Sequence, residues 1–348
     1  MEETIRFTIN EVINETADAK SYLLKTDDQP DFLPGQFLTF LVSVNNKEYR
    51  RSYSIVTLPG EQLKIIVKRV ENGVVSRYIF DNWHKGSALT ALPPSGRFTL
   101  QTQSSIQRDI YFIIAGSGIT PAIPHIRNLL INERQSALHL IYSNHNEHST
   151  IFLAEIKRLD DEYENLFVEF LFSDPNLHFE QRKRLNNGLL EKMIGKSLKY
   201  RHENAVFMLC GPFTFMRMAK ITAIFMGFHA DQIKTEHFIP EILYSGTHQT
   251  PVYSDRTVSI IYKNRRYRVS VTKNQSILRA ARLQNLELPY SCEGGICATC
   301  MAKCISGKVD MTINEVLTPK DLQKGLVLTC TGHPMTDDVL IDFDTTDQ

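Results

Sequence analysis

Residues 290–300 read Tyr290-Ser291-Cys292-Glu293-Gly294-Gly295-Ile296-Cys297-Ala298-Thr299-Cys300, and this stretch decides the fold of the C-terminal part of the chain. Its cysteines have the spacing C-x4-C-x2-C, and a fourth cysteine follows after 29 residues. Four thiolates at this spacing hold the two irons of a [2Fe–2S] cluster. The two glycines allow the backbone to fold closely around a cluster and to turn its N–H groups toward the sulfides. The predicted ligands are Cys292, Cys297, Cys300 and Cys330.

Two other uses of these cysteines are weaker. A structural zinc site usually pairs two short C-x2-C knuckles, and only one pair here has that spacing. A disulfide framework would suit a secreted protein, but the N-terminus does not resemble a secretory signal. The remaining cysteines, Cys210 and Cys304, are expected to be free thiols. A reducing cytoplasm suits such a protein best.

Length and composition set broad limits on the function. At 348 residues the chain is too long for one ordinary core, so two or three domains are expected. It is 42% hydrophobic and 22% charged with a formal net charge of +0, which argues against nucleic acid as the main partner. No apolar run is long enough to cross a bilayer, so no integral membrane segment is expected. A monomer is compatible with these features.

The pattern of apolar runs and turn residues changes along the chain. Residues 1–103 contain the β-rich runs Phe37–Val44 and Leu63–Val67, and Pro34-Gly35 and Pro59-Gly60 mark turns, which predicts a small β-barrel. Residues 104–240 alternate between apolar runs and helical stretches, which predicts a doubly wound parallel sheet. The apolar runs are Ile110–Ala115, Ala137–Tyr142, Phe167–Phe172 and Ala205–Cys210.

The last part of the chain has a third pattern of predicted elements. Residues 241–256 contain Gly246 and Pro251 and are expected to form a linker. In residues 257–348 a predicted hairpin, Thr257–Tyr262 with Tyr267–Val271, precedes a short helix from Ser276 to Gln284. The expected architecture is therefore a β-barrel, an α/β domain and a small α+β domain that carries the cluster.

A short motif near residue 50 has the chemistry of a flavin site. In Arg51-Ser52-Tyr53-Ser54 an arginine can neutralise a phosphate, a tyrosine ring can pack against a flavin, and a serine hydroxyl can hydrogen-bond the flavin edge. Taken alone, the motif is equally an exposed strand with one aromatic residue. Its weight comes from the motifs that follow it.

A second motif suits a pyrophosphate. Val67-Lys68-Arg69 precedes the turn Gly73-Val74-Val75-Ser76, so basic residues stand just before a glycine turn that leads into a helix. Helix N-termini bind phosphates through their free N–H groups. The alternative is an ordinary helix start capped near Ser76.

Two glycine loops follow predicted buried strands. Ala115-Gly116-Ser117-Gly118-Ile119-Thr120-Pro121 reads G-x-G-x-x-P and lies between a strand and a helix, where a dinucleotide phosphate binds. Cys210-Gly211-Pro212 follows another strand at the same expected edge of the sheet. In the plainer interpretation, Cys210 is a small buried hydrophobic residue and Gly-Pro is a loop.

The order of these motifs resembles the ferredoxin–NADP reductase superfamily, and within it the members with a C-terminal plant-type [2Fe–2S] ferredoxin domain. The ordered set R-x-Y-S, G-x-x-S, G-x-G-x-T-P, C-G-P and C-x4-C-x2-C…C covers nearly the whole chain. The resemblance implies that the cluster-carrying α+β domain is of the β-grasp type. The segments Glu315-Val316-Leu317 and Val327–Pro334 resemble the subgroup that serves multicomponent oxygenases.

The resemblance implies roles for matching positions. Ser54 would lie near the flavin edge that accepts hydride, Cys210 near the nicotinamide ring, and Glu236 would help to position that ring; a surface carboxylate is the plain alternative for Glu236. The residues implied to bind FAD are Arg51, Tyr53, Ser54, Val67, Lys68, Gly73, Val74, Val75, Ser76 and Phe238. Those implied to bind NADH or NADPH are Gly116, Gly118, Thr120, Pro121, Cys210, Gly211 and Pro212.

The chain departs from the pattern of NADPH-using relatives after its second nucleotide-domain strand. Where an arginine often pairs with the 2′-phosphate, this chain has Tyr142-Ser143-Asn144-His145, which favours NADH. Arg182 and Arg184 come later and are not placed by the sequence. Cys304 is expected to be a buried free thiol rather than a ligand.

The implied activity is electron transfer from NADH or NADPH through FAD to the [2Fe–2S] cluster and on to an oxygenase or other acceptor protein that docks near the cluster. Alternatives are a reductase for another hydroxylase or a fatty-acid desaturase, or a non-catalytic redox sensor. Residues 287–348 hold ten acidic and four basic residues, a net charge of 4 − 10 = −6. These acidic residues either steer docking onto a basic partner or only keep the surface soluble.

Overall fold

A computed structural model describes residues 3–71, 73–174, 178, 182–238, 253–273, 275–291, 293–295, 297–314 and 316–345. The chain divides into two compact units, Glu3–His237 and the residues from Phe238 onward. The predicted linker, residues 241–256, lies outside the described residues except for its last four positions. No helix in the described ranges is both long and apolar enough to cross a membrane.

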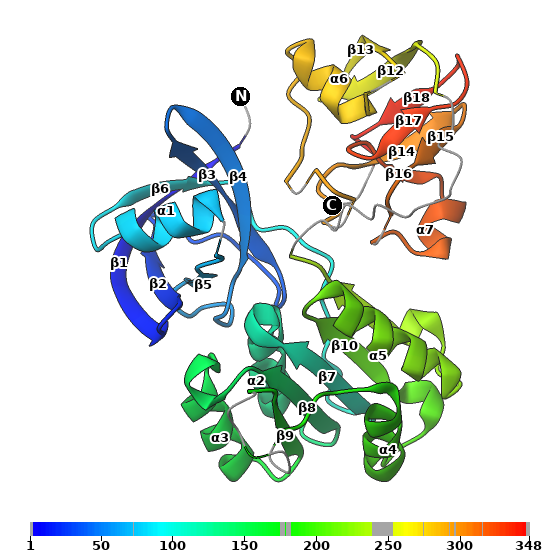
Figure 1. The fold of residues 1–348 in the computed structure, drawn as a ribbon. Coiled ribbons are helices and arrows are strands. Elements are labelled where there is room, and N and C mark those ends of the chain that lie inside the picture. The colour runs from blue at the N-terminus through cyan, green and yellow to red at the C-terminus, as the bar shows by residue number, and fades with distance from the viewer. Residues whose placement is uncertain are drawn as a thin grey trace. The chain divides into compact units, whose positions relative to one another are not determined.

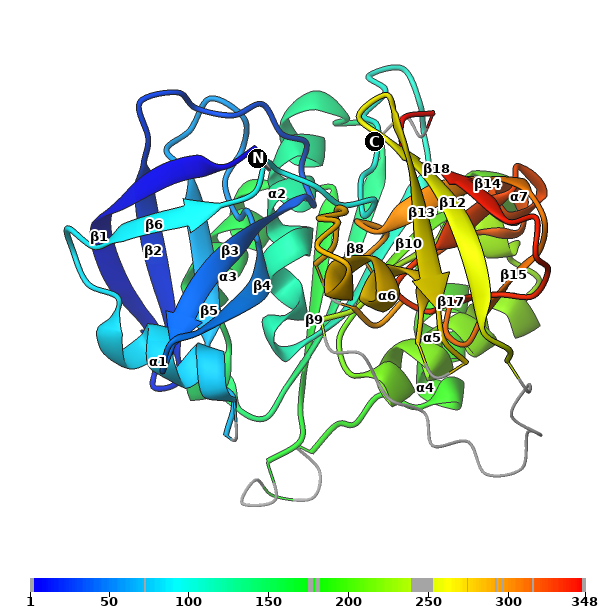
Figure 2. The same ribbon diagram turned by 90° about the horizontal axis from the view of Figure 1, so that it is seen from above.

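The first unit begins with an antiparallel barrel (Figure 1). Its six strands pair in the order β4-β3-β6-β1-β2-β5, and an antiparallel bridge between Ile55 and Ile65 joins the two ends of this sheet. Helix α1 (Val74–Asn82) lies at one end of the barrel (Figure 2). The core contains Trp83, whose ring packs edge-on against Tyr22 and Phe40. The strands are β1 (Ile5–Thr16), β2 (Ala19–Lys25), β3 (Phe37–Val44), β4 (Lys47–Ser54), β5 (Lys64–Lys68) and β6 (Ala88–Ala91).

The same unit continues into a five-stranded parallel sheet covered by helices on both faces. Apolar residues of α2 and α3 form one core with the sheet, and apolar residues of α4 and α5 form a second core on the other face. The strands are β7 (Asp109–Ala115), β8 (Ala137–Asn144), β9 (Leu166–Phe172), β10 (Val206–Cys210) and β11 (Ile233–Glu236). The helices are α2 (Ile119–Asn132), α3 (Leu153–Glu162), α4 (Asn187–Ser197) and α5 (Phe213–Phe225).

The strand order of this sheet defines where a ligand binds. The order is β11-β10-β7-β8-β9, so the chain moves outward from β7 in one direction through β8 and β9 and in the other through β10 and β11. In open α/β sheets, ligands bind at the carboxyl ends of the strands where the order reverses. This point lies between β7 and β10, and the expected barrel and doubly wound sheet are both confirmed.

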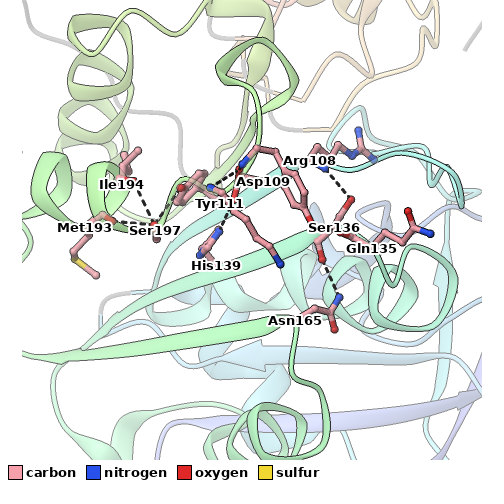
Figure 3. Close-up of polar contacts among 12 residues, drawn as sticks. Arg108, Asp109, Tyr111, Gln135, Ser136, His139, Asn165, Met193, Ile194 and Ser197 are labelled. Carbon is pink, nitrogen blue, oxygen red and sulfur yellow. Dashed lines mark hydrogen bonds and ion pairs between the residues drawn. The ribbon is translucent and has the colours of Figure 1, made fainter.

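A buried polar cluster occupies the opposite edge of the sheet (Figure 3). Asp109, at the amino end of β7, accepts hydrogen bonds from the backbone N–H groups of Lys199 and Tyr200 and lies 2.9 Å from Nε2 of His139. Nearby, Arg108 forms a buried ion pair with Glu133 at 2.8 Å. Because these groups stabilise one another at the amino ends of the strands, we interpret the cluster as structural.

Within the first unit, helix α2 of the parallel-sheet part contacts the barrel. Arg127 of α2 makes a forked interaction with both carboxylate oxygens of Glu61, at 2.9 and 2.6 Å. The buried imidazole of His125 lies 2.7 Å from the carbonyl oxygen of Phe98. Gly35 packs against the same carbonyl, where a Cβ atom would come within 1.9 Å. These contacts fix α2 against the barrel.

The second unit contains a five-stranded mixed sheet in the order β13-β12-β18-β14-β16, a two-stranded sheet of β15 and β17, and two short helices. Helix α6 begins after Ser276, whose hydroxyl accepts the N–H of Arg279. The expected cluster-carrying α+β domain is therefore present. Its elements are β12 (Arg256–Tyr262), β13 (Arg265–Val271), α6 (Ile277–Leu283), β14 (Met301–Ser306), β15 (Val309–Met311), α7 (Pro319–Gln323), β16 (Leu326–Leu328), β17 (Gly332–Pro334) and β18 (Leu340–Asp342).

Candidate redox and nucleotide sites

Strand pairing brings two predicted cluster ligands together. Cys300 immediately precedes β14, Cys330 follows β16, and Met301 of β14 pairs with Leu328 of β16 in antiparallel register. The hydroxyl and the N–H of Thr329 both bond to the carbonyl oxygen of Cys300, at 3.0 and 3.2 Å. The two thiols are in hydrogen-bond contact.

The loop that leads into β14 holds the third described ligand, Cys297. Cys297 is 9% exposed and Cys300 is 2% exposed. Gly295 has a φ of +77°, and a Cβ atom there would come within 2.6 Å of the carbonyl oxygen of Ile313. Only glycine fits this close approach without strain. The fourth predicted ligand, Cys292, lies outside the described residues.

Contact between Cys300 and Cys330 shifts the pKa values of these two predicted ligands in opposite directions. A hydrogen bond from the thiol of Cys300, together with bonds from Gly295 and Thr331, lowers the pKa of Cys330 against the opposing effect of burial. The pKa of Cys300 is correspondingly raised. Among the described residues, no three His, Cys, Asp or Glu side chains converge on a point suited to one metal ion. Thiolates are the ligands that iron–sulfur clusters take, so Cys297, Cys300 and Cys330 fit a [2Fe–2S] cluster.

The flavin motif lies where the barrel closes. The antiparallel bridge between Ile55 and Ile65, with the N–H of Val56 2.9 Å from the carbonyl oxygen of Lys64, joins the end of β4 to β5. Residues before Ile55 therefore face residues after Ile65, so the segment of Tyr53 and Ser54 lies opposite the segment of Val67 and Lys68. The predicted flavin and pyrophosphate motifs, which are separate in the sequence, thus lie at the junction of β4 and β5; we call this junction the barrel seam.

The side chains of the flavin motif differ in exposure. Tyr53 packs with its ring 6.2 Å from that of Phe40, and burial raises its pKa. Arg51 lies two residues earlier on the same strand face and is exposed, so its guanidinium is accessible to a phosphate. Ser54 is 6% exposed. A strand that is only an exposed surface would not bury Ser54 or pack the ring of Tyr53 against Phe40.

The predicted pyrophosphate turn forms the start of α1. Gly73 is the N-cap residue, so the N–H groups of Val74, Val75 and Ser76 are the first of the helix. A Cβ atom at Gly73 would come within 2.4 Å of the Ser76 hydroxyl, which accepts the N–H of Val70 at 3.1 Å. Ser76 therefore shapes the turn rather than capping the helix as a normal N-cap. Lys68 lies 3.4 Å from Asp18, a partner that the sequence did not reveal.

The two glycine loops, after β7 and after β10, contact one another where the strand order of the sheet reverses. A Cβ atom on Gly118 would come within 2.3 Å of the carbonyl oxygen of Cys210, and one on Gly211 within 2.9 Å of the Cβ of Ala115. Gly116 has a φ of +54°, a left-handed conformation that favours glycine. The glycines of both motifs therefore allow the ends of β7 and β10 to approach closely beside the expected dinucleotide.

Cys210 and Glu236 lie side by side. They are paired in the parallel register of β10 and β11 and are 1% and 9% exposed. Burial, with a smaller contribution from the Glu236 charge, raises the pKa of Cys210, so its thiol stays protonated at neutral pH. Glu236 is thus not the surface carboxylate of the plain alternative. Thr120 and Pro121 are buried in the first turn of α2, and the Thr120 hydroxyl bonds to the carbonyl oxygen of Ser117 at 3.0 Å.

The thiol of Cys304 and the ring of Phe238 are both partly exposed. Cys304 was expected to be buried, but the thiol is half-buried on β14, 3.2 Å from the carbonyl oxygen of Ser306, because the strand runs toward an exposed turn at Gly307. That part of the prediction is wrong. Phe238 is 45% exposed, and its approach to the flavin stays a prediction.

The structure adds residues near the nucleotide loops that sequence patterns did not single out. Ser143, at the carboxyl end of β8, has a buried hydroxyl with no hydrogen-bond partner among the described residues. The N–H of Asp174 bonds to the carbonyl oxygen of His145 at 2.9 Å, and the Asp174 carboxylate accepts the amide of Asn146 at 3.1 Å. These contacts place polar groups beside the edge where the adenosine ribose would lie.

Family models match all three parts of the chain. The models are described as an oxidoreductase FAD-binding domain over residues 6–100, an oxidoreductase NAD-binding domain over residues 112–220, and a 2Fe-2S iron-sulfur cluster binding domain over residues 261–335. With the sites above, they define the class of the protein: a reductase that uses FAD, a nicotinamide dinucleotide and a [2Fe–2S] cluster.

Relatives of similar length narrow this class. The chain is 35% identical over 351 residues to a subunit of the 1,2-phenylacetyl-CoA epoxidase of Escherichia coli (strain K12), with 97% of each chain covered. It is 29% identical to the ferredoxin reductase component of 3-ketosteroid-9-alpha-monooxygenase of Rhodococcus rhodochrous, covering 98% of this chain and 97% of that one. The chain belongs to the family of oxygenase reductase components that includes this subunit of 1,2-phenylacetyl-CoA epoxidase.

Solved structures agree at the level of fold. Phthalate dioxygenase reductase matches with a TM-score of 0.61 and 22% identity, covering 98% of both chains. An intact type IV self-sufficient cytochrome P450 monooxygenase matches with a TM-score of 0.75 and 19% identity, covering 97% of this chain and 41% of that one. The three-domain arrangement predicted from the motifs is therefore confirmed.

Proposed function

We propose that this reductase delivers electrons to the oxygenase component of a phenylacetyl-CoA epoxidase. The observation that carries the proposal is the full-length 35% identity to one subunit of that enzyme. The predicted likeness of the segment Val327–Pro334 to this subgroup points the same way. When bound, FAD accepts two electrons from the nicotinamide and releases them singly to the one-electron [2Fe–2S] carrier.

The proposed residue roles are supported by the positions described above. Arg51 and the N–H groups at the start of α1 neutralise the FAD phosphates, while Tyr53 and Ser54 hold the flavin against the barrel seam. Cys210 and Glu236 position the nicotinamide, and Cys292, Cys297, Cys300 and Cys330 hold the cluster. We propose the domain bounds 1–103, 104–240 and 257–348, with the linker 241–256. Unbridged thiols in the described chain suit a reducing cytoplasm, and we propose a monomer.

The nucleotide is proposed to be NADH. A carboxylate near the end of the second strand of a dinucleotide fold can accept hydrogen bonds from the ribose hydroxyls and repels a 2′-phosphate. Asp174, held by Asn146, supplies such a carboxylate, and His145 stands where an arginine would favour NADPH. Arg182 and Arg184 flank Lys183, whose N–H bonds to the carbonyl oxygen of Phe172, so they lie beyond β9 rather than at β8.

A second candidate partner belongs to the same class. Reductase components of 3-ketosteroid-9-alpha-monooxygenase match over the same length at 29% identity or less, so another oxygenase or a hydroxylase is the alternative acceptor. A non-catalytic redox sensor would be reduced by NADH without sustained turnover.

Reconstitution tests the proposal. The purified reductase is combined with the oxygenase components of a phenylacetyl-CoA epoxidase, and NADH oxidation and epoxide formation are measured together. Coupled consumption of NADH and phenylacetyl-CoA is expected. NADH-dependent reduction of artificial acceptors without epoxide formation would contradict the phenylacetate assignment and leave another oxygenase as the partner.

A further inference from the structure

The iron–sulfur unit separates its charges along the chain. Residues 256–286 contain eight arginines and lysines and no acidic residue, whereas residues 287–348 contain ten acidic residues and four lysines. The sequence drew attention to the acidic half as a surface that could steer docking. The hydrogen bonds and ion pairs of each charged side chain within the unit show which half presents unpaired charge to solvent.

Most of the acidic side chains have partners within the unit. The carboxylates that are used in this way cap a helix, accept backbone N–H groups, accept a hydroxyl or form ion pairs. They are Asp321 with Thr318, Asp344 with the N–H groups of Lys263 and Asn264, Asp310 with the Tyr253 hydroxyl, Asp337 with Arg256, and Glu293 with Arg282. Asp342 is only 7% exposed. Among the acidic residues of this half that the structure describes, only Glu287 and Asp338 are exposed and have carboxylates in no ion pair or hydrogen bond.

The basic half is different. Five exposed cations on β13, α6 and the turn between them form no ion pair with any residue in the described ranges: Arg265, Arg266, Arg268, Lys273 and Arg279. Strand β13 is an edge of its sheet, and charged side chains often protect such edges from unwanted pairing. That explanation covers the arginines of β13, but it does not cover Arg279, which lies on a helix.

Helix α6 contacts both segments that carry cluster ligands. The N–H of Leu278 bonds to the carbonyl oxygen of Thr329 at 2.9 Å, next to Cys330. The guanidinium of Arg282 lies 4.2 Å from the ring centre of Tyr290 and its Nη1 lies 2.8 Å from the Glu293 carboxylate, in the loop of Cys292. Any protein that covers α6 is therefore close to the cluster loop.

Three side chains share the solvent side of α6. Arg279, Arg282 and Leu283 are spaced i, i+3 and i+4, which places them together on one helix face. Leu283 is 65% exposed, an unusual position for a large apolar side chain. We call these three residues the α6 face. It combines an apolar centre with two arginines, a composition that is enriched in protein interfaces.

We propose that the α6 face is the docking surface for an acidic patch on the electron-acceptor protein. The inference rests on the proposed function, because it assumes that an external protein takes electrons from the cluster. An unpaired arginine can bind a carboxylate with two parallel hydrogen bonds, and opposite charges accelerate encounter. Docking here also keeps the transfer distance short, on which electron-transfer rates depend steeply. The acceptor is thus expected to be acidic, not basic.

The test separates docking from the supply of electrons. The cluster is reduced with dithionite, excess reductant is removed without oxygen, and the protein is mixed with an acidic or a basic c-type cytochrome in a stopped-flow instrument. With the acidic cytochrome, the second-order rate should fall as salt is added, and Arg279→Glu should lower it about tenfold at low salt. The affinity for a redox-inactive, zinc-substituted acidic cytochrome should fall in parallel.

The matched control is Lys320→Glu, an equal charge change on exposed α7, which should alter the rate less than about twofold. Glu at position 279 lies in the first turn of α6, where a negative charge is favourable, so the variant should fold. Leu283→Gln should weaken binding without changing its salt dependence. A second-order rate that is unchanged by Arg279→Glu, or a faster reaction with the basic cytochrome than with the acidic one, would overturn the proposal. Failure of NADH to reduce the cluster would instead overturn the proposed function, because dithionite bypasses that step.

Discussion

Gly118 lies directly against the carbonyl group of Cys210: a Cβ atom on residue 118 would come within 2.3 Å of the carbonyl oxygen and 2.6 Å of its carbon. The two residues belong to loops that are more than ninety positions apart in the sequence, G-x-G-x-x-P and C-G-P. Their contact holds together the ends of β7 and β10, where the nicotinamide dinucleotide is proposed to bind. The fit of this site therefore depends on the absence of one side chain.

Replacing Gly118 with alanine is expected to separate the two loops. The added methyl group meets backbone atoms, which cannot turn away as a flexible side chain would, so the variant should lose about 1–3 kcal/mol of unfolding free energy. Its KM for NADH should rise about tenfold, which corresponds to about 1.4 kcal/mol of binding. Steady-state kinetics with a small-molecule acceptor measures this. The control, Gly195→Ala in α4, adds a methyl group with no atom within 4 Å and should leave KM unchanged.

The buried His125 predicts a specific pH dependence of stability. Burial lowers the pKa of His125 to about 4, from an ordinary value of 6.5. Between these values the unfolded chain binds a proton that the folded chain does not, so stability is complete above about pH 6.5 and falls as the pH is lowered. His125→Gln should remove about 2 kcal/mol of the loss between pH 7 and pH 5.

Denaturant unfolding followed by the fluorescence of Trp83, the one tryptophan of the chain, measures this difference. Trp83 lies in the same compact unit as His125. An equal loss of stability in the two proteins between pH 7 and pH 5 would show that His125 titrates normally in the folded state.

The two cysteines of the β14 region predict opposite phenotypes. Cys330 is a proposed ligand that strand pairing brings beside Cys300, whereas Cys304 points its thiol toward the carbonyl oxygen of Ser306. Cys330→Ser should lose the visible absorption of the cluster and most of the iron, and Cys304→Ser should keep both. Iron analysis and visible spectra of the two purified variants check this. Loss of iron from Cys304→Ser alone would reverse the assignment.

Nucleotide preference is expected to follow the loops at the ends of β8 and β9. The double variant His145→Arg/Asp174→Ser supplies a cation and removes the carboxylate, so the ratio of kcat/KM for NADH over NADPH should fall at least about tenfold, the effect of about 1.4 kcal/mol. The control variant Arg184→Gln should leave the ratio unchanged. A wild-type protein that prefers NADPH, and loses that preference on Arg184→Gln, would contradict the NADH proposal.

Much of the fold could be predicted from the sequence, because buried strands leave strong apolar patterns. The run Phe37–Val44 is β3 itself, and Ile110–Ala115 falls one residue short of β7. The long strand β1 gave no such signal because it alternates irregularly between buried and exposed positions and pairs with β2 through bulges. The start of α6 was correct because Ser276 is a strong N-cap residue.

The sites were predictable in their motifs but not in their partners. Local spacing identified the glycine loops and the cysteines, since each motif is continuous in the sequence. The pairing of Lys68 with Asp18, and of Arg127 with Glu61, depends on segments that meet only after the barrel and the sheet have folded. The same limitation applies to charge: counting acidic residues suggested an acidic docking surface, while the fold assigns most of those carboxylates to internal partners.

Anaerobic titration with NADH, followed by visible and EPR spectra, tests the central claim most directly. The proposed electron path predicts that the flavin absorption bleaches and that a reduced [2Fe–2S] signal appears before any partner protein is added. A flavin that is reduced while the cluster stays oxidised, or a protein that contains zinc in place of iron, would contradict it.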